Sequence, residues 1–126
     1  MYVVIAGGGM MGSTLGRRLL ADRHDVVVIE QDKAVCEKIA ARSGAVALHG
    51  QATDIDILEE AGLRKADVAV AALPIDAANL AFCLLAREFD VPRIVARMRS
   101  PRYETAYKLA GVTRTIDGAV CSSATS

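Results

Sequence analysis

Three glycines and one glutamate near the N-terminus are the residues whose types and spacing best suit ligand binding. Gly7, Gly9 and Gly12 form a G-x-G-x-x-G pattern, and Glu30 follows eighteen residues after the last glycine. Such glycines permit a tight turn, a close backbone approach to a pyrophosphate, and close packing of the next helix. An acidic side chain at the end of the following strand can accept hydrogen bonds from ribose hydroxyls. The pattern therefore predicts a nucleotide site, with phosphates at the glycines and a ribose at Glu30.

Two apolar runs must supply the strands that place these residues. Residues 2–6 and 26–29 are rich in β-branched side chains, and Met11, Leu15 and Leu19 recur between them at helical spacing. A helix that begins directly after the glycines directs its free N–H groups at bound phosphates. An ordinary glycine-rich turn and a solvated carboxylate are the alternatives without a ligand, but the complete β-α-β unit favours a binding site.

The residues after the second apolar run indicate which nucleotide is accepted. A carboxylate at Glu30 would repel the 2′-phosphate of NADP, and Gln31 and Asp32 supply no cation to neutralise it. We therefore expect NAD or NADH, with ADP, ATP or AMP as alternatives, in preference to NADP.

The rest of the chain alternates strand and helix patterns without a linker. Such alternation predicts an α/β fold: a doubly wound, Rossmann-like parallel six-stranded sheet in the order 3-2-1-4-5-6. The expected strands are 2–6, 26–30, 46–49, 67–72, 94–97 and 112–116, and the expected helices are 10–22, 33–43, 54–61, 75–89 and 101–110.

Composition limits the size and partners of the protein. With 126 residues, the chain suits one domain, expected over 1–117, followed by a flexible tail over 118–126. The 15 basic and 15 acidic residues cancel, which predicts no nucleic-acid partner. No apolar stretch approaches the ~20 residues that span a bilayer, so we expect a cytoplasmic protein without direct membrane insertion.

The sequence contains no recognisable catalytic or metal-binding motif. His24 and His49 are far apart in the expected fold and lack further ligands, so no metal site is predicted. Tyr107 stands where the Tyr-x-x-x-Lys pair of a short-chain reductase would need a lysine after Tyr103. We therefore expect no catalytic residue and no enzyme activity.

The cysteines are odd in number and widely spaced, which predicts free thiols rather than a disulfide or a metal site. Cys36 and Cys83 fall in expected helices and suit small core positions, whereas Cys121 falls in the expected tail.

Together these motifs resemble a known family, the Trk-type potassium transport regulatory NAD-binding domain, also called the RCK, KTN or TrkA-N domain. The resemblance implies a nucleotide-sensing regulatory domain that controls a potassium transporter or channel. It also implies a homodimer or higher ring, cytoplasmic and peripheral at the inner membrane through a separate membrane potassium-transport subunit. The residues that carry it are 3–12, 28–32, 49–53, 57–62, 66–71 and 94–97.

The resemblance also implies a cofactor-binding set in the loops after successive strands. In it, Ala52 and Thr53 edge the adenine, and Ala72 and Leu73 flank the adenosine. Arg97 lies at the end of the fifth strand. A ligand contact and a surface ion pair are two equally supported roles for its side chain. The full set is Gly7, Gly9, Met10, Met11, Gly12, Glu30, Gln31, Gln51, Ala52, Thr53, Ala72, Leu73 and Arg97.

Three positions depart from the family pattern. Met10 stands where relatives usually carry arginine, and Gln51 and Ser100 stand where they commonly carry aspartate. Met10 removes a charge-assisted phosphate contact, typically worth about 1.5 to 3 kcal/mol, which favours NAD(H) or a diphosphate over a triphosphate. The alternative is that Met10 and Met11 pack against a neighbour and the site is altered, which leaves an assembly scaffold.

Two further features bear on function. Residues 77–86 are apolar nearly all round, which favours a helix buried partly against a second protomer. The alternative function is a cofactor-binding fragment of an NAD-dependent oxidoreductase, which would need a substrate domain and a proton-transfer residue.

Overall fold

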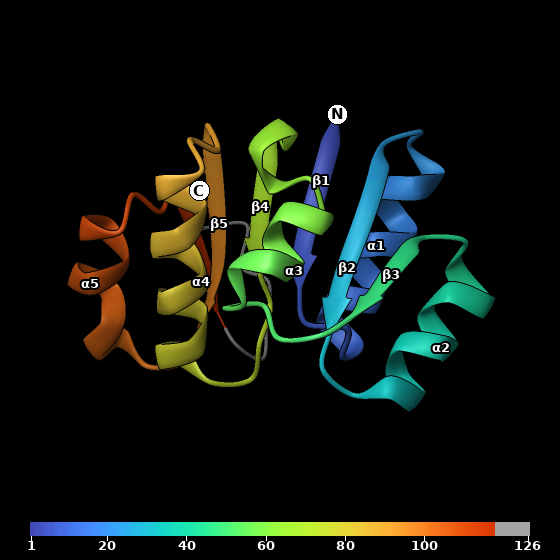
Figure 1. The fold of residues 1–126 in the computed structure, drawn as a ribbon. Coiled ribbons are helices and arrows are strands. Elements are labelled where there is room, and N and C mark those ends of the chain that lie inside the picture. Colours follow the sequence, from blue (N-terminus) through green and yellow to red (C-terminus); the bar gives the residue numbers. More distant parts are fainter. Residues whose placement is uncertain (118–126) are drawn as a thin grey trace.

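The computed structural model describes residues 1–117, in which strands and helices alternate (Figure 1). The strands are β1 (Tyr2–Ala6), β2 (Asp25–Glu30), β3 (Val46–His49), β4 (Val68–Ala71), β5 (Arg93–Met98) and β6 (Arg114–Asp117). The helices are α1 (Met10–Ala21), α2 (Lys33–Ser43), α3 (Ile55–Glu60), α4 (Asp76–Glu88) and α5 (Glu104–Leu109), with 3₁₀ turns η1 (Leu63–Lys65) and η2 (Pro101–Tyr103).

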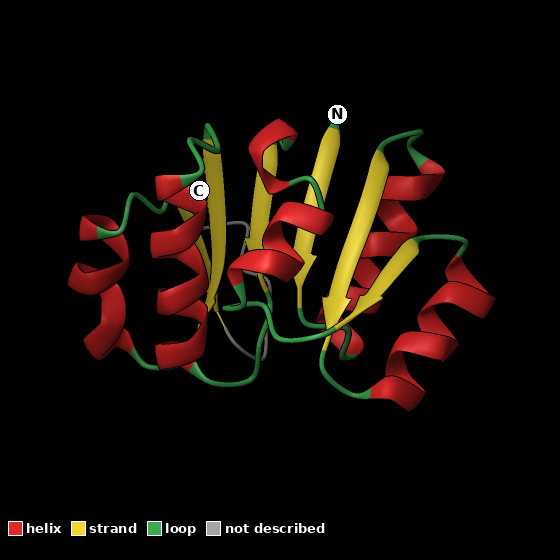
Figure 2. Cartoon of the chain, in the orientation of Figure 1, coloured by secondary structure: helices red, strands yellow, loops and turns green. Residues whose placement is uncertain are grey.

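The strands form one six-stranded sheet in the order β3-β2-β1-β4-β5-β6, and every neighbouring pair is parallel. This confirms the predicted fold class and strand order. Helices cover both faces of the sheet (Figure 2), with α3 and α4 in front of it and α1 behind in the view of Figure 1. Parallel strands need such crossovers because each must restart at the same edge.

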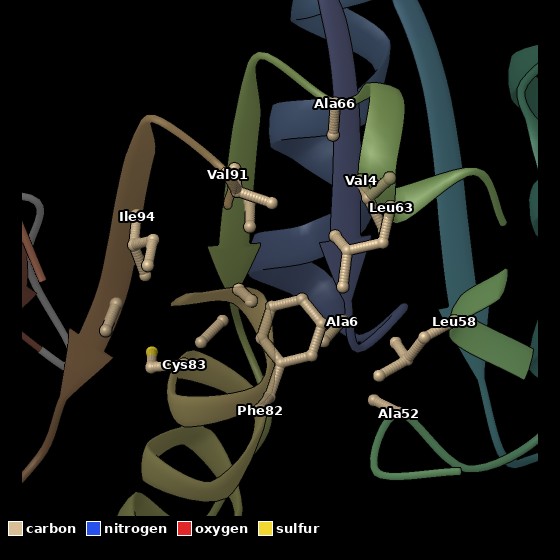
Figure 3. Packing of buried hydrophobic residues seen from close by; sticks show 14 of the residues in the cluster. Val4, Ala6, Ala52, Leu58, Leu63, Ala66, Phe82, Cys83, Val91 and Ile94 are labelled. Carbon is tan, nitrogen blue, oxygen red and sulfur yellow. The ribbon is translucent and has the colours of Figure 1, made fainter. Parts of the chain in front are cut away.

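The core consists of two apolar layers because neighbouring residues of a strand point to opposite faces. Val4 and Ala6 of β1 belong to the layer under α3, α4 and α5, whereas Val3 and Ile5 belong to the layer under α1 and α2. Figure 3 shows Phe82 of α4 projecting toward β1 within the first layer. The Phe82 side chain is fully buried, which contributes roughly 1.5 to 3 kcal/mol relative to exposure.

Local capping explains the starts of α2 and α3 and the end of α2. The Asp32 carboxylate accepts hydrogen bonds from the amides of Ala34 (2.9 Å) and Val35 (3.3 Å) at the start of α2, and Gly44 ends that helix at φ 75°. Asp54 caps α3 through the amide of Asp56 at 2.9 Å. The sequence predicted these starts and the Gly44 stop correctly.

Three details differ from the sequence-based expectation. The turn η1 was not predicted, since Leu63–Lys65 carries no periodic pattern longer than one turn. The expected helix 101–110 begins as η2, where Ser100 and Pro101 form a cap before α5. The last strand begins at Arg114 rather than residue 112, because the Val112 amide donates to the Tyr107 carbonyl (3.0 Å) and completes the helix-ending turn.

Cys36 and Cys83 are buried free thiols, as predicted. Cys121 and the expected flexible tail, 118–126, lie outside the described residues. Among the helices of residues 1–117, none is long and apolar enough to cross a membrane.

Candidate functional site

The glycine-rich turn after β1 is packed so tightly that at two of its positions a side chain would collide with backbone atoms. Gly7 has φ +104°, and a Cβ there would lie 2.7 Å from the carbonyl oxygen of Ala72. A Cβ on Gly12 would collide with the Gly7 carbonyl oxygen. The turn therefore brings β1, the end of β4 and the start of α1 together, as the first and third glycines of the motif predicted.

Gly9 differs from the other two glycines because it faces open space. A Cβ added there would meet no heavy atom within 4 Å. Gly9 is also the N-cap of α1, which has no side-chain cap and no acidic residue in its first turn. Within the described residues, the amides of Met10 and Met11 have no hydrogen-bond acceptor, so this helix end offers donors and a positive dipole to an anion.

Glu30 lies at the end of β2 and is already bonded to the loop. Its Oε1 accepts a hydrogen bond from the Gly8 amide at 2.8 Å, and its Oε2 accepts one from the Asp32 amide at 2.6 Å. A carboxylate has about four acceptor positions, so acceptor positions remain for ribose hydroxyls. The sequence analysis did not include Gly8 among the site residues. A Cβ at this position would collide with the Ile39 side chain of α2.

A cavity of about 200 Å³ lies at the end of β2, between the loops that follow β2, β3 and β4. Ile29 and Gln31, the chain neighbours of Glu30, line it, whereas Glu30 itself does not. The cavity brings together five of the residues predicted from sequence: Gln31, Gln51, Ala52, Thr53 and Leu73. Its wall also includes Gly50, Pro74, Ile75 and Ala78, which the sequence analysis did not name. No charged side chain of residues 1–117 lines it, so it suits an uncharged, flat group such as a nucleobase.

Asn79 fixes the loop after β4 and was also missed. Its side chain is 1% exposed, accepts from the Leu73 amide (2.8 Å) and donates to the Leu73 carbonyl (2.9 Å). The same amide nitrogen donates to the Arg97 carbonyl at 3.2 Å. Asn79 therefore ties the wall of the cavity to the end of β5.

Asp76 fixes the next loop along the same edge. Its carboxylate accepts from the amides of Arg99 (3.0 Å) and Ser100 (2.9 Å) and from the Tyr107 hydroxyl (2.9 Å). Burial alone would raise the pKa of Asp76, but these three hydrogen bonds outweigh it and lower that pKa. Burial, together with the Asp76 carboxylate, raises the pKa of Tyr107.

A sequence signal for these two residues did exist. Asp76 and Asn79 are three residues apart in an otherwise apolar helix segment, so they share the buried face of α4. Buried polar side chains need partners, and at this edge the partners are loop backbone groups.

The other predicted residues lie outside the cavity. Ala72 is buried against Gly7, and Met11 packs against the core layer under α1. Met10 is 89% exposed, so it does not pack within the domain. Arg97 is partly buried at the end of β5, and its Nε is buried without a hydrogen-bond partner among the described residues. The ion pair weighed for Arg97 is not formed within residues 1–117.

The histidines and Tyr107, which could in principle serve in catalysis or metal binding, lie close to or bond other groups of the domain. Nδ1 of His24 lies 2.9 Å from the N-terminal amino group, and Nε2 of His49 lies 3.0 Å from the Gln31 carbonyl oxygen. Over residues 1–117, no group of three His, Cys, Asp or Glu side chains is placed to hold a metal ion. Tyr107 is fully buried, and its hydroxyl donates a hydrogen bond to Asp76.

The family model of the TrkA-N domain matches residues 3–117. A Trk system potassium uptake protein TrkA homolog from Methanothermobacter thermautotrophicus is 46% identical over 116 residues, which cover 92% of this chain and 54% of that protein. The chain spans about half the length, or less, of the curated relatives it matches.

Solved structures share the fold. The AMP-bound Kef CTD of Shewanella denitrificans aligns with a TM-score of 0.81 at 27% identity, covering 93% of this chain and 71% of that one. The GsuK channel bound to NAD aligns with a TM-score of 0.81 over 90% of this chain and 21% of that one. At 24% identity, the second likeness shows the common fold alone.

Proposed function

This chain belongs to the TrkA-N domain family, and from that premise we propose that it is a nucleotide-sensing regulatory domain of a potassium transporter or channel. Its ligand is NAD(H) or an adenine nucleotide. The observation that carries the proposal is the pairing of an uncapped α1 N-terminus with a bonded Glu30 and an uncharged cavity along one edge of the sheet.

Each part of the ligand has a matching part of this edge. The phosphates lie over Gly9 and the first amides of α1, where no side chain occupies the space. The ribose hydroxyls donate to the free acceptor positions of Glu30. The adenine enters the cavity between Gln51 and Leu73, whose walls carry no charge.

The same edge favours a dinucleotide or a diphosphate over a triphosphate. Met10 is exposed beside the phosphate position and brings no charge. Arg97 is a cation near the end of β5, and β4 separates that strand from β1 and the glycine turn. Its Nε has no hydrogen-bond partner within residues 1–117. A ligand that reaches from Glu30 across the α1 N-terminus toward Arg97 would contact both ends of this edge. NAD(H) suits this better than a mononucleotide because a dinucleotide is longer.

Assembly is the second part of the proposal. We propose a homodimer or higher ring in contact with a separate membrane potassium-transport subunit, since Leu84 of α4 stays 50% exposed and Leu109 of α5 stays 72% exposed. Related TrkA proteins carry potassium-uptake names and are longer than this chain. Light scattering of the purified chain should give a mass above that of a monomer.

The test of the nucleotide proposal is calorimetric titration with NADH, NAD, ATP, ADP, AMP and NADP in parallel. We expect micromolar binding of NAD(H) or an adenine nucleotide and much weaker binding of NADP. The unfolding free energy should rise by about 2.7 kcal/mol at a ligand excess of a hundredfold over Kd. Glu30→Ala should abolish binding, whereas the control Glu88→Ala removes an exposed carboxylate at the far end of α4 and should not.

Two results would oppose the proposal. Absence of binding to all six nucleotides would leave assembly as the function. Hydride transfer from bound NADH to a small carbonyl compound would favour an oxidoreductase fragment.

A further inference from the structure

A second cavity lies between α1 and α2, on the other side of the sheet from the cavity at the end of β2. Its volume is about 320 Å³, and Gly8 and Gly9 are among the residues that line it. Both helices run from the carboxyl edge of the sheet, so one row of side chains from each forms a wall of this α1–α2 groove. The α1 row is Met10, Ser13 and Arg17, and the α2 row contains Val35, Lys38, Ile39 and Arg42.

The charges in the α1–α2 groove are all of one sign. Arg17, Lys38 and Arg42 line it and are exposed, and among the described residues no acidic side chain lines it. Within residues 1–117, the salt bridges of the structure join other residues, so these three cations have no carboxylate partner. Cations gathered in a concave site raise the local positive potential and attract anions.

The uncharged residues of the groove have their own roles. Ile39 is buried and, with Val35, gives the groove an apolar floor. The Ser13 hydroxyl donates to the Gly8 carbonyl at 2.8 Å, and the Ser43 hydroxyl donates to the Ile39 carbonyl at 2.6 Å. Since both hydroxyl protons are used, an anion in the groove would depend on the three cationic side chains.

We propose that the α1–α2 groove is a binding site for the phosphate group of an organic phosphate. Two guanidinium groups and one ammonium group offer the bidentate and point-charge contacts that suit a phosphate better than a single carboxylate. The apolar floor accommodates the carbon part of the ligand. The groove adjoins the nucleotide edge at Gly9 and Met10, but its three cations lie farther along α1 and α2, and the inference does not depend on the function proposed above.

Glu30 does not line the α1–α2 groove. Its carboxylate is bonded to the amides of Gly8 and Asp32. The phosphate can belong to a soluble metabolite or to a phospholipid headgroup, because the chemistry of recognition is the same.

The test uses inorganic pyrophosphate as the probe, followed by the backbone amide NMR signals of the full chain in the presence of saturating AMP. We expect saturable shifts in residues 13–17 and 35–43. The variant R17Q/K38Q/R42Q should bind pyrophosphate about tenfold more weakly or worse. The control variant K65Q/R93Q/R102Q removes the same charge from exposed positions outside the groove and should bind as the unchanged chain does.

Sedimentation with vesicles of equal parts phosphatidylcholine and phosphatidylglycerol distinguishes the two sources of phosphate. Binding that the groove variant loses and the control variant keeps identifies a lipid headgroup, whereas pyrophosphate binding without vesicle binding identifies a soluble phosphate. Equal loss in both variants, or shifts confined to the glycine turn, would overturn the proposal. The last pattern would still leave the nucleotide site intact, so the two proposals can fail separately.

Discussion

Glu30 and Gly8 are joined by a hydrogen bond of 2.8 Å, from the Gly8 amide to Oε1 of the carboxylate. The side chain assigned to the ribose therefore also holds the loop assigned to the phosphates. A change at Glu30 should alter both contacts at once, because the carboxylate orders the loop before any ligand arrives.

The first prediction concerns Glu30→Gln. A glutamine keeps one acceptor for Gly8 but turns an NH₂ group toward the Asp32 amide, where two donors meet. We expect a lower melting temperature and at least about tenfold weaker nucleotide binding, since a bond to a charged group is lost. Titration calorimetry measures the affinity. Glu88→Gln is the matched control, and equal affinities for the two variants would contradict the role of Glu30.

The second prediction compares two glycines of α1. Gly12→Ala places a methyl group on the Gly7 carbonyl oxygen, so the unfolding free energy should fall by about 1 to 3 kcal/mol. Gly16→Ala places its methyl group 3.8 Å from Ile5, Val26 and Val28, which is ordinary contact, and should stabilise the helix by about 0.5 to 1 kcal/mol. Urea unfolding of both variants tests this, and a shared sign would refute the packing argument.

The third prediction concerns Asn79. Asn79→Ala leaves the amide and carbonyl of Leu73 without their buried partner, which should cost about 1 to 3 kcal/mol of stability. Hydrogen exchange at the Leu73 amide should accelerate more than exchange in β1. Gln51→Ala serves as control, because Gln51 is exposed in the same cavity and its loss should affect the ligand but not the fold.

The fourth prediction is a pH dependence of stability. Because the folded state lowers the pKa of Asp76, its contribution is fully present above the unfolded pKa of about 3.9 and is lost as pH falls through the lower folded pKa. The urea midpoint should therefore drop on acidification below about pH 4. Asp76→Asn should be less stable at pH 7 and should lose less unfolding free energy on acidification. The control Asp22→Asn, at an exposed position, should show the same pH dependence as the protein without a substitution.

The fifth prediction restores the missing cation. Met10 is exposed beside the first amides of α1, so Met10→Arg should place a guanidinium near the phosphates without disturbing the core. We expect ATP affinity to rise roughly threefold to tenfold and AMP affinity to change little. Met10→Gln is the uncharged control. An equal gain for ATP and AMP would show that the guanidinium does not reach the terminal phosphates.

The fold could be predicted from sequence because its signals are local. β-branched runs, capping aspartates and Gly44 each act within a few residues, and the alternation of elements then leaves few topologies. The glycine turn could be predicted equally well. The motif places glycine where the backbone needs a positive φ, at Gly7, and where it allows no Cβ, at Gly12.

The parts that were missed depend on contacts between distant segments. Asp76 and Asn79 bond to backbone groups of β5 and the loop after it, and no local pattern indicates which loop a buried polar residue will reach. The role of Gly8 depends on Ile39, thirty-one residues later, which fills the space a side chain would need. The surroundings of Arg97 likewise follow from the order of the strands.

The placement of the two cavities on opposite sides of the sheet has a consequence for access. The cavity at the end of β2 is walled by the loops that lead into α3 and α4, whereas the α1–α2 groove is walled by the other helical layer. A protein that docks over α3 and α4 would close the first and leave the second open to solvent. Under the two proposals above, a ligand in the α1–α2 groove could then exchange with solvent while a ligand in the other cavity could not.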